Sequence, residues 1–139
     1  MDLKSLDTIA AADRGAPLHL RHPSTDTPLM DETTGEPVSI TLLGADSADF
    51  RRAEHAQQEK RIAKAQRSGR MAPGAGKQIE EDYIELLALA TKSWQHIILD
   101  GVRLECNRET AKTLYTRFPW IREQVSTFIG SRSNYLGNS

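Results

Sequence analysis

The clearest hydrophobic pattern in the chain lies in residues 78–98. Apolar side chains recur there every three or four positions: Ile79, Tyr83, Leu86, Leu87, Ala90, Trp94 and Ile97. This spacing is typical of a helix that carries a wide apolar stripe on one face. The pattern therefore predicts an amphipathic α-helix over residues 78–98.

Capping and turn residues mark the elements that follow. Asp100-Gly101 is a strong turn dipeptide, and a short pair of strands is expected around it, near 98–105. Asn107 suits the N-cap of a helix over 108–117. Pro119 suits the first turn of a last helix, which is predicted to run to about residue 130.

The N-terminal third has a different period. Residues 17–22 and 37–43 alternate apolar and polar side chains, which predicts two strands of a hairpin with a long loop. A lone hairpin is marginally stable in water, so we expect it to pack on a helix or to pair with another chain. Leu3, Leu6 and Ile9, three positions apart, form either a short helical face or an arm that becomes ordered on a partner.

Residues 47–68 are rich in alanine, glutamine, glutamate, lysine and arginine, which are good helix formers. Asp46 or Ser47 can cap this helix. Apart from alanines, its apolar residues are only Phe50 and Ile62. Such a helix buries little surface by itself, so we expect it to be exposed or to lie along a partner.

These patterns predict an α+β protein that is mainly helical. Hydrophobic residues make up 38% of the 139 positions, below the usual roughly 45–50%, so the core is expected to be small. The predicted parts are an N-terminal arm and β-rich region (1–44), a basic helix (45–68), a flexible Gly-rich linker (69–77), a helical core (78–130) and a tail (131–139).

The net charge of −1 hides a strong segregation of charge along the chain. Residues 1–50 contain nine acidic and three basic residues, and residues 51–70 contain seven basic and two acidic residues. Residues 78–100 are again acidic. Segments of opposite sign can attract each other or select partners, although salt screens exposed charges beyond about 8 Å.

Several classes of protein are disfavoured by composition. The single cysteine, Cys106, excludes a disulfide within the chain and a cysteine-rich zinc site. No apolar run approaches the roughly 20 residues that span a bilayer, so no membrane partner is expected. The first residues lack the basic-then-apolar order of a signal peptide, and we expect the protein in a bacterial-type or host cytoplasm, in reduced form.

The candidate catalytic and metal-binding residues are weak. His19 and His22 would face opposite sides of a strand. Gly74-Ala75-Gly76-Lys77 lacks the spacing and the following hydroxyl residue of a phosphate-binding loop. Cys106 precedes a helix start, which could lower its pKa, but a half-buried small residue is the favoured interpretation. We therefore expect no enzyme activity, no catalytic residues, no cofactor and no metal.

A protein-binding surface is the stronger prediction. Trp120 directly follows Pro119 at a helix start, with Arg117 and Arg122 nearby, and an exposed tryptophan of this kind would anchor an interface. Arg51 and Arg52 open the basic helix. We expect the contact surface to include residues 108–130 and 51–67.

The run 51–70 also has a nucleic-acid alternative, because seven bases on one helix could meet phosphates. No aromatic residues interleave with these bases, and Glu54 and Glu59 interrupt the run. A solvated helix, or one docked on an acidic protein surface, is therefore favoured, and nucleic acid is not the expected partner.

The order of motifs along nearly the whole chain resembles the tail assembly chaperones of long-tailed phages and prophages. The most specific parts are the run Pro119-Trp120-Ile121-Arg122-Glu123-Gln124-Val125 and the ending Arg132-Ser133-Asn134-Tyr135-Leu136. Weaker parts are the start from Leu3 to Thr8, His22-Pro23, the strand from Val38 to Gly44, Asp46-Ser47, Trp94, Leu99-Asp100-Gly101, the run Asn107 to Ala111, and Leu114-Tyr115.

This resemblance implies a small cytoplasmic protein that coats the tape-measure protein, keeps it soluble and helps to recruit tail tube subunits. It also implies that some members are made in a frameshift-extended form. Self-association is a further expected contact. The resemblance carries no catalytic residues. Two alternatives remain: a structural tail or neck protein of the virion, whose β region adds to a neighbour's sheet, and a nucleic-acid-binding regulator that uses residues 51–70.

Overall fold

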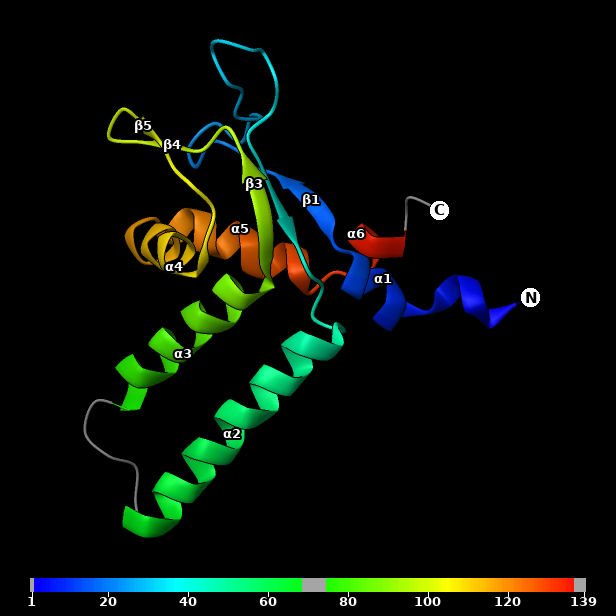
Figure 1. Ribbon diagram of the computed structural model, residues 1–139, viewed down its shortest axis with the longest axis vertical. Helices are drawn as coiled ribbons and strands as arrows, with labels where there is room; N and C mark the ends of the chain where they lie inside the picture. The colour runs from blue at the N-terminus through cyan, green and yellow to red at the C-terminus, as the bar shows by residue number, and fades with distance from the viewer. Residues whose placement is uncertain (1, 69–74, 137–139) are drawn as a thin grey trace.

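The computed structural model describes residues 2–68 and 75–136. The first half contains a 3₁₀ helix η1 (Leu3–Leu6), α1 (Thr8–Arg14), β1 (Ala16–His19), β2 (Ser39–Leu42) and α2 (Ala48–Ser68). The second half contains α3 (Ala75–Ala90), β3 (Thr91–Gln95), β4 (Ile98–Leu99), β5 (Val102–Arg103), α4 (Arg108–Arg117), α5 (Pro119–Ile129) and α6 (Ser133–Leu136). The predicted class, α+β and mainly helical, is confirmed (Figure 1).

The predicted hairpin is present and forms part of a three-stranded antiparallel sheet in the order β1-β2-β3. Leu18 pairs with Ile40 across the first two strands, and Ile40 pairs with Trp94 across the second two. Backbone hydrogen bonds continue the hairpin beyond the strands, since Leu20 N–H donates to the Val38 oxygen at 3.0 Å. The third strand supplies the extra support that a lone hairpin needs.

That third strand corrects the prediction of one helix over 78–98. The helix ends at Ala90, and the chain continues directly as β3. Trp94 and Ile97 fit the helical period, but the backbone from Thr91 to Gln95 pairs with β2 instead. Pairing with β2 therefore overrides the local period, and the predicted helical core (78–130) also contains strands.

One hydrophobic core joins the sheet to α3, α4 and α5. Its fully buried members come from every layer: Leu20, Ile40, Leu42, Leu87, Leu114, Tyr115 and Val125. The Tyr115 hydroxyl lies 2.6 Å from the Thr91 hydroxyl, at the junction of α3 and β3. Burial raises the pKa of Tyr115. The helical unit and the hairpin are thus parts of one core.

The two chain ends pack together. Tyr135 of α6 is buried with Ala11 and Ala16, and its ring lies edge-on to Phe128 at 5.6 Å. A Cβ at Gly44 would come within 2.9 Å of the Ala12 Cβ, so only glycine fits beside α1. The predicted tail is therefore integral to the fold up to residue 136, and residues 137–139 lie outside the described part.

Capping of α2 differs from the prediction. The side chain that accepts from the Ala48 N–H is Asp13 of α1, at 3.1 Å. Asp46 instead pairs with Arg132 at 2.6 Å, and the hydroxyl of buried Ser47 finds no hydrogen bond among the residues described. The cap comes from a distant part of the chain, which local sequence spacing does not reveal.

The basic helix α2 and the acidic helix α3 lie side by side at the lower end of Figure 1. Gln57 donates to the Asp82 backbone oxygen at 2.8 Å, and Arg61 approaches the Asp82 carboxylate at 3.8 Å. The segregated charges thus meet within one molecule. Of the predicted flexible linker (69–77), residues 75–77 belong to α3, and 69–74 fall outside the described residues.

Candidate functional site

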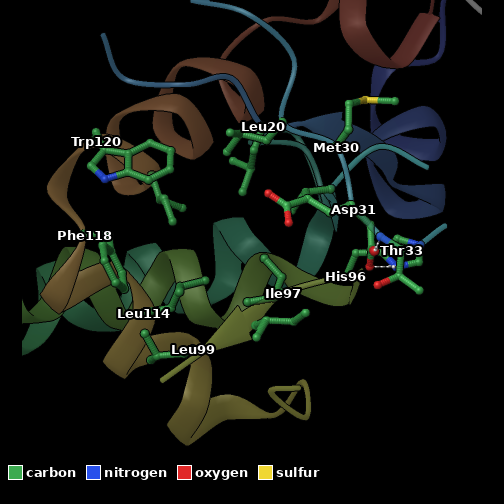
Figure 2. A pocket seen from close by; sticks show the side chains of 15 residues that line it. Leu20, Met30, Asp31, Thr33, His96, Ile97, Leu99, Leu114, Phe118 and Trp120 are labelled. Carbon is green, nitrogen blue, oxygen red and sulfur yellow. Dashed lines mark hydrogen bonds and ion pairs between the residues drawn. The ribbon is translucent and has the colours of Figure 1, made fainter. Parts of the chain in front are cut away.

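An open cleft of about 420 Å³ lies between the 20–38 segment, the β4–β5 hairpin and the corner where α4 meets α5 (Figure 2). Most of the side chains that line it are apolar, including Leu29, Met30, Ile98, Leu99, Phe118 and Trp120. Met30 and Ile98 are 50% and 54% exposed, so the apolar surface reaches solvent. A concave apolar surface of this kind is the usual form of a binding site.

The α4–α5 corner positions the aromatic wall of the cleft. Phe118 ends α4, where its N–H donates to the Leu114 oxygen at 3.0 Å. Pro119 then opens α5, as predicted. The rings of Phe118 and Trp120 meet edge to face at 6.3 Å. The Pro119 start therefore holds both aromatic side chains against the cleft.

The β4–β5 hairpin forms a second wall. Its two-residue turn, Asp100-Gly101, has positive φ at both positions, 53° and 78°. These are the angles of a type I′ turn, and the predicted turn and short strand pair are confirmed. Leu99 and Ile98 of β4 both line the cleft.

The 20–38 segment forms the third wall and is ordered by its own turns. Leu29 N–H donates to the Leu20 oxygen, and Val38 N–H donates to the Leu29 oxygen, both at 2.9 Å. The Gln124 side chain of α5 also bonds the backbone N–H and oxygen of Arg21, at 2.9 and 2.8 Å. The long loop is therefore fixed to the helical unit.

A charged cluster closes one end of the cleft. The His96 Nδ1 atom lies 2.9 Å from the Asp31 carboxylate, and its Nε2 atom lies 2.9 Å from the Glu36 carboxylate. Asp31 is buried and accepts the Thr33 and Thr34 N–H groups at 2.8 and 3.2 Å. These backbone bonds, followed by His96, lower the pKa of Asp31, while burial opposes them.

This cluster was not predicted from the sequence. His96 lies in the segment that the helical period assigned to 78–98, and it has a positive φ of 66°. Residues 31–36 belong to the long loop predicted between the two strands and contain a turn, but no spacing in the sequence indicates that this turn meets His96. His19 and His22 are both exposed, but only His19 lies in β1, so they do not share one strand as predicted.

The predicted site residues of α4 and α5 differ in their position relative to the cleft. Trp120 is half-buried and lines it. Arg117 lies over the Phe118 ring at 5.4 Å and pairs with Asp100 at 3.1 Å. Arg122 pairs with Glu80 of α3 at 3.2 Å. Arg117 and Trp120 thus share the corner, whereas Arg122 ties α5 to α3.

Arg51 and Arg52 are placed elsewhere. Both are exposed on the first turns of α2, and Arg52 pairs with Asp49 at 3.1 Å. The chain enters α2 beside the far end of α5, where Ala45 N–H donates to the Ile129 oxygen at 3.0 Å. The structure therefore does not bring Arg51 and Arg52 together with Trp120, and their binding role stays a prediction.

Other candidate chemistry is limited in the described part of the chain. Burial raises the pKa of the half-buried Cys106 thiol, opposite to the shift that a helix start would produce. Within residues 2–68 and 75–136, no group of three or more histidine, cysteine or acidic side chains is placed to hold a metal ion. Gly74-Ala75-Gly76-Lys77 falls partly outside these residues, and Gly76 and Lys77 belong to α3.

Comparison of the chain with protein-family models, with curated proteins and with solved structures gives no match. Among the helices described, none is both long enough and apolar enough to span a bilayer.

Proposed function

We propose that this protein is a tail assembly chaperone of a long-tailed phage or prophage, which binds the tape-measure protein and keeps it soluble until the tail tube assembles. The observation that carries the proposal is the open apolar cleft at the α4–α5 corner. The resemblance in sequence order supports it, and the family's task requires a surface for apolar protein segments.

The cleft suits a helical client. An amphipathic helix can lay its apolar stripe into a hydrophobic groove, with anchors three or four residues apart. A tape-measure protein is a long helical chain whose apolar stripes would otherwise aggregate. The aromatic pair Phe118 and Trp120 provides large contact area at one wall, as anchor residues do in protein interfaces.

The test is co-expression with the tape-measure protein of the same phage or prophage. We expect the chain to raise the soluble fraction of the tape-measure protein and to co-purify with it. Ile98→Glu, at an exposed position in the cleft, should abolish both effects. Ile79→Glu is the matched control, because Ile79 is similarly exposed, at 42%, on α3, outside the cleft and outside residues 51–67 and 108–130. Equal solubilisation by both variants would overturn the proposal.

A structural tail or neck protein is the second candidate, and the sheet favours it. Within the described residues, β1 and β3 are outer strands with one free edge each. A neighbouring subunit can add a strand to such an edge. Mass spectrometry of purified particles separates the two functions, because an assembly chaperone leaves the mature particle, whereas a structural subunit stays at stoichiometric copy number.

A further inference from the structure

The N-terminal arm, here η1 and α1, exposes apolar side chains although it is folded. Leu3, Leu6 and Ile9 are 72%, 46% and 54% exposed. Leu3 and Leu6 share a face because they are three apart in a 3₁₀ turn. The Asp7 side chain caps α1 by accepting the Ala10 N–H at 3.0 Å. The arm is thus held in place with its apolar side chains uncovered.

The inner side of the arm fixes its direction. Ala11 and Ala12 are buried, and Ala11 packs in the cluster of Tyr135. Asp13 of the same helix caps α2. Both contacts anchor α1 to the body of the protein, so Ile9 projects from a fixed helix. Leu3 and Leu6 lie on the preceding 3₁₀ turn, where the Asp7 N–H donates to the Lys4 oxygen at 3.3 Å.

Arm and cleft cannot meet within one molecule. In Figure 1 the N-terminus lies at the right-hand end and α1 lies beside α6, whereas β4, β5 and the α4–α5 corner lie at the left. The arm is anchored at Ala11, Ala12 and Asp13, so it cannot swing across the sheet. One chain therefore presents an apolar projection and an apolar groove at opposite ends.

The arm and the cleft each carry one charged side chain that can pair across a contact. Lys4 lies between the exposed leucines of the arm, whose Asp2 and Asp7 carboxylates accept the Lys4 and Ala10 N–H groups. Glu32 lines the cleft beside Asp31, whose carboxylate accepts the Thr33 and Thr34 N–H groups. Neither Lys4 nor Glu32 has an ion-pair partner within the described part of its own molecule. An unpaired base beside one apolar surface and an unpaired acid inside the other can pair across an interface and set its orientation.

We infer that the arm of one copy docks in the cleft of a second copy, with Leu3, Leu6 and Ile9 against the apolar walls and Lys4 facing Glu32. The contact joins two different surfaces, so it is heterologous. Each copy keeps a free arm at one end and a free cleft at the other. Such an interface extends into a ring or a filament and does not stop at a dimer.

The contact does not depend on the proposed function, because it needs only this chain. If the cleft also takes the tape-measure protein, the arm and the client compete for the same walls. Loss of the arm would then leave tape-measure binding intact or strengthened. Self-association without client binding would contradict the proposed function alone. Client binding without self-association would contradict the arm-to-cleft contact alone.

The experiment is sedimentation velocity of the full chain over a range of concentrations. The arm variant carries Leu3→Ser, Leu6→Ser and Ile9→Ser. The cleft variant carries Met30→Glu and Ile98→Glu. All five positions are exposed, so both variants should fold, which circular dichroism and thermal melting check. Ile62→Ser is the matched control on an exposed apolar residue outside both surfaces.

We expect concentration-dependent oligomers for the wild-type chain and for Ile62→Ser, and a dissociation constant raised about tenfold or more, that is by ~1.4 kcal/mol or more, for each of the other two variants. An equal mixture of arm and cleft variants should form a heterodimer that does not extend, because it contains one intact arm and one intact cleft. Lys4→Glu or Glu32→Lys alone should weaken association, and the two together should restore it.

Three results would overturn the inference. One is a wild-type chain that remains monomeric at the highest concentration it tolerates. Another is an oligomer that persists in the arm variant or in the cleft variant. The third is a mixture of these two variants that forms no heterodimer, since only a contact between unlike surfaces predicts that species.

Discussion

The α4–α5 corner and the basic helix α2 are built in opposite ways, although sequence patterns single out both as binding surfaces. At the corner, Leu114 and Ile121 are buried in the core and also line the cleft. On α2, Phe50 is buried, but most of the side chains that follow are exposed. At the corner the same residues form the core and line the cleft. On α2 the buried residues differ from the exposed ones that could bind a partner.

The comparison shows what a substitution reports in each region. A change in the floor of the cleft removes core packing together with any binding, so stability and binding have to be measured side by side. A change on the outer face of α2 leaves the core intact, so any loss there is a loss of contact. Met30 and Ile98 lie in the cleft but are exposed, so a substitution there tests binding in the cleft without removing core packing.

The largest expected effect is at Leu114, which is 2% exposed. Leu114→Ala should lower the free energy of unfolding by about 2–5 kcal/mol, because it removes buried methyl groups and leaves a cavity. Urea denaturation measures this change. Ile62→Ala on α2 is the control and should stay within about 0.5 kcal/mol of wild type. A loss at Leu114 no larger than the control would contradict the shared role of the corner.

A smaller loss is expected at Tyr115, which joins α4 to the start of β3. Tyr115→Phe removes the hydroxyl that lies 2.6 Å from the Thr91 hydroxyl. Thr91 keeps its bond to the Leu87 oxygen, so no buried group loses its only partner. We expect a decrease of about 1 kcal/mol in the free energy of unfolding. Thr116→Val, at an exposed position on α4, provides a nearby control.

The contribution of Asp31, at the charged end of the cleft, to the free energy of unfolding should depend on pH. The pKa of the Asp31 carboxyl is lowered in the folded protein, chiefly by the Thr33 and Thr34 N–H groups. The folded state therefore binds this proton less readily than the unfolded chain, whose value is about 3.9. Its stabilising effect is present above that value and is lost as pH falls through the lower folded pKa.

Denaturation of wild type and Asp31→Asn from neutral to acidic pH checks this sign. The difference in stability between them should shrink as the solution becomes acidic. Glu123→Gln, which removes an exposed carboxylate from α5, is the control variant. A difference that grows with acidity would mean that the carboxyl is held protonated, against the hydrogen bonds that it accepts.

The smallest effect on stability is expected at the start of α2. Arg51→Ala with Arg52→Ala should change the free energy of unfolding by less than about 0.5 kcal/mol, because both side chains are exposed and the Arg52–Asp49 pair is a surface ion pair. Pull-down with the tape-measure protein then tests the predicted contact directly. Unchanged binding would mean that the tape-measure protein does not contact Arg51 and Arg52. Reduced binding would mean that its contact surface includes the start of α2.

Elements with strong local signals could be predicted from the sequence. Asn107 accepts the Thr110 N–H at 2.9 Å and caps α4 as expected, and Pro119 begins α5. Signals that depend on distant partners could not be predicted. His96 was hidden inside a helical period, and Asp13 caps a helix that begins 35 positions later. Of the candidate site, Trp120 was found through its place beside Pro119, but nothing local indicated Met30 or Ile98 as walls of one cleft.

The sequence by itself determined the class of the fold, the hairpin and most helix starts, because periodicity, capping and turn residues act over a few positions. Only the tertiary structure decided that α3 ends at Ala90, since the backbone after it hydrogen-bonds to β2 and not to the preceding helical turn. It also decided that Tyr135, near the C-terminus, packs against Ala11 and Ala16, and that three separate segments form the cleft. Those outcomes depend on which surfaces meet, and that is a property of the whole chain.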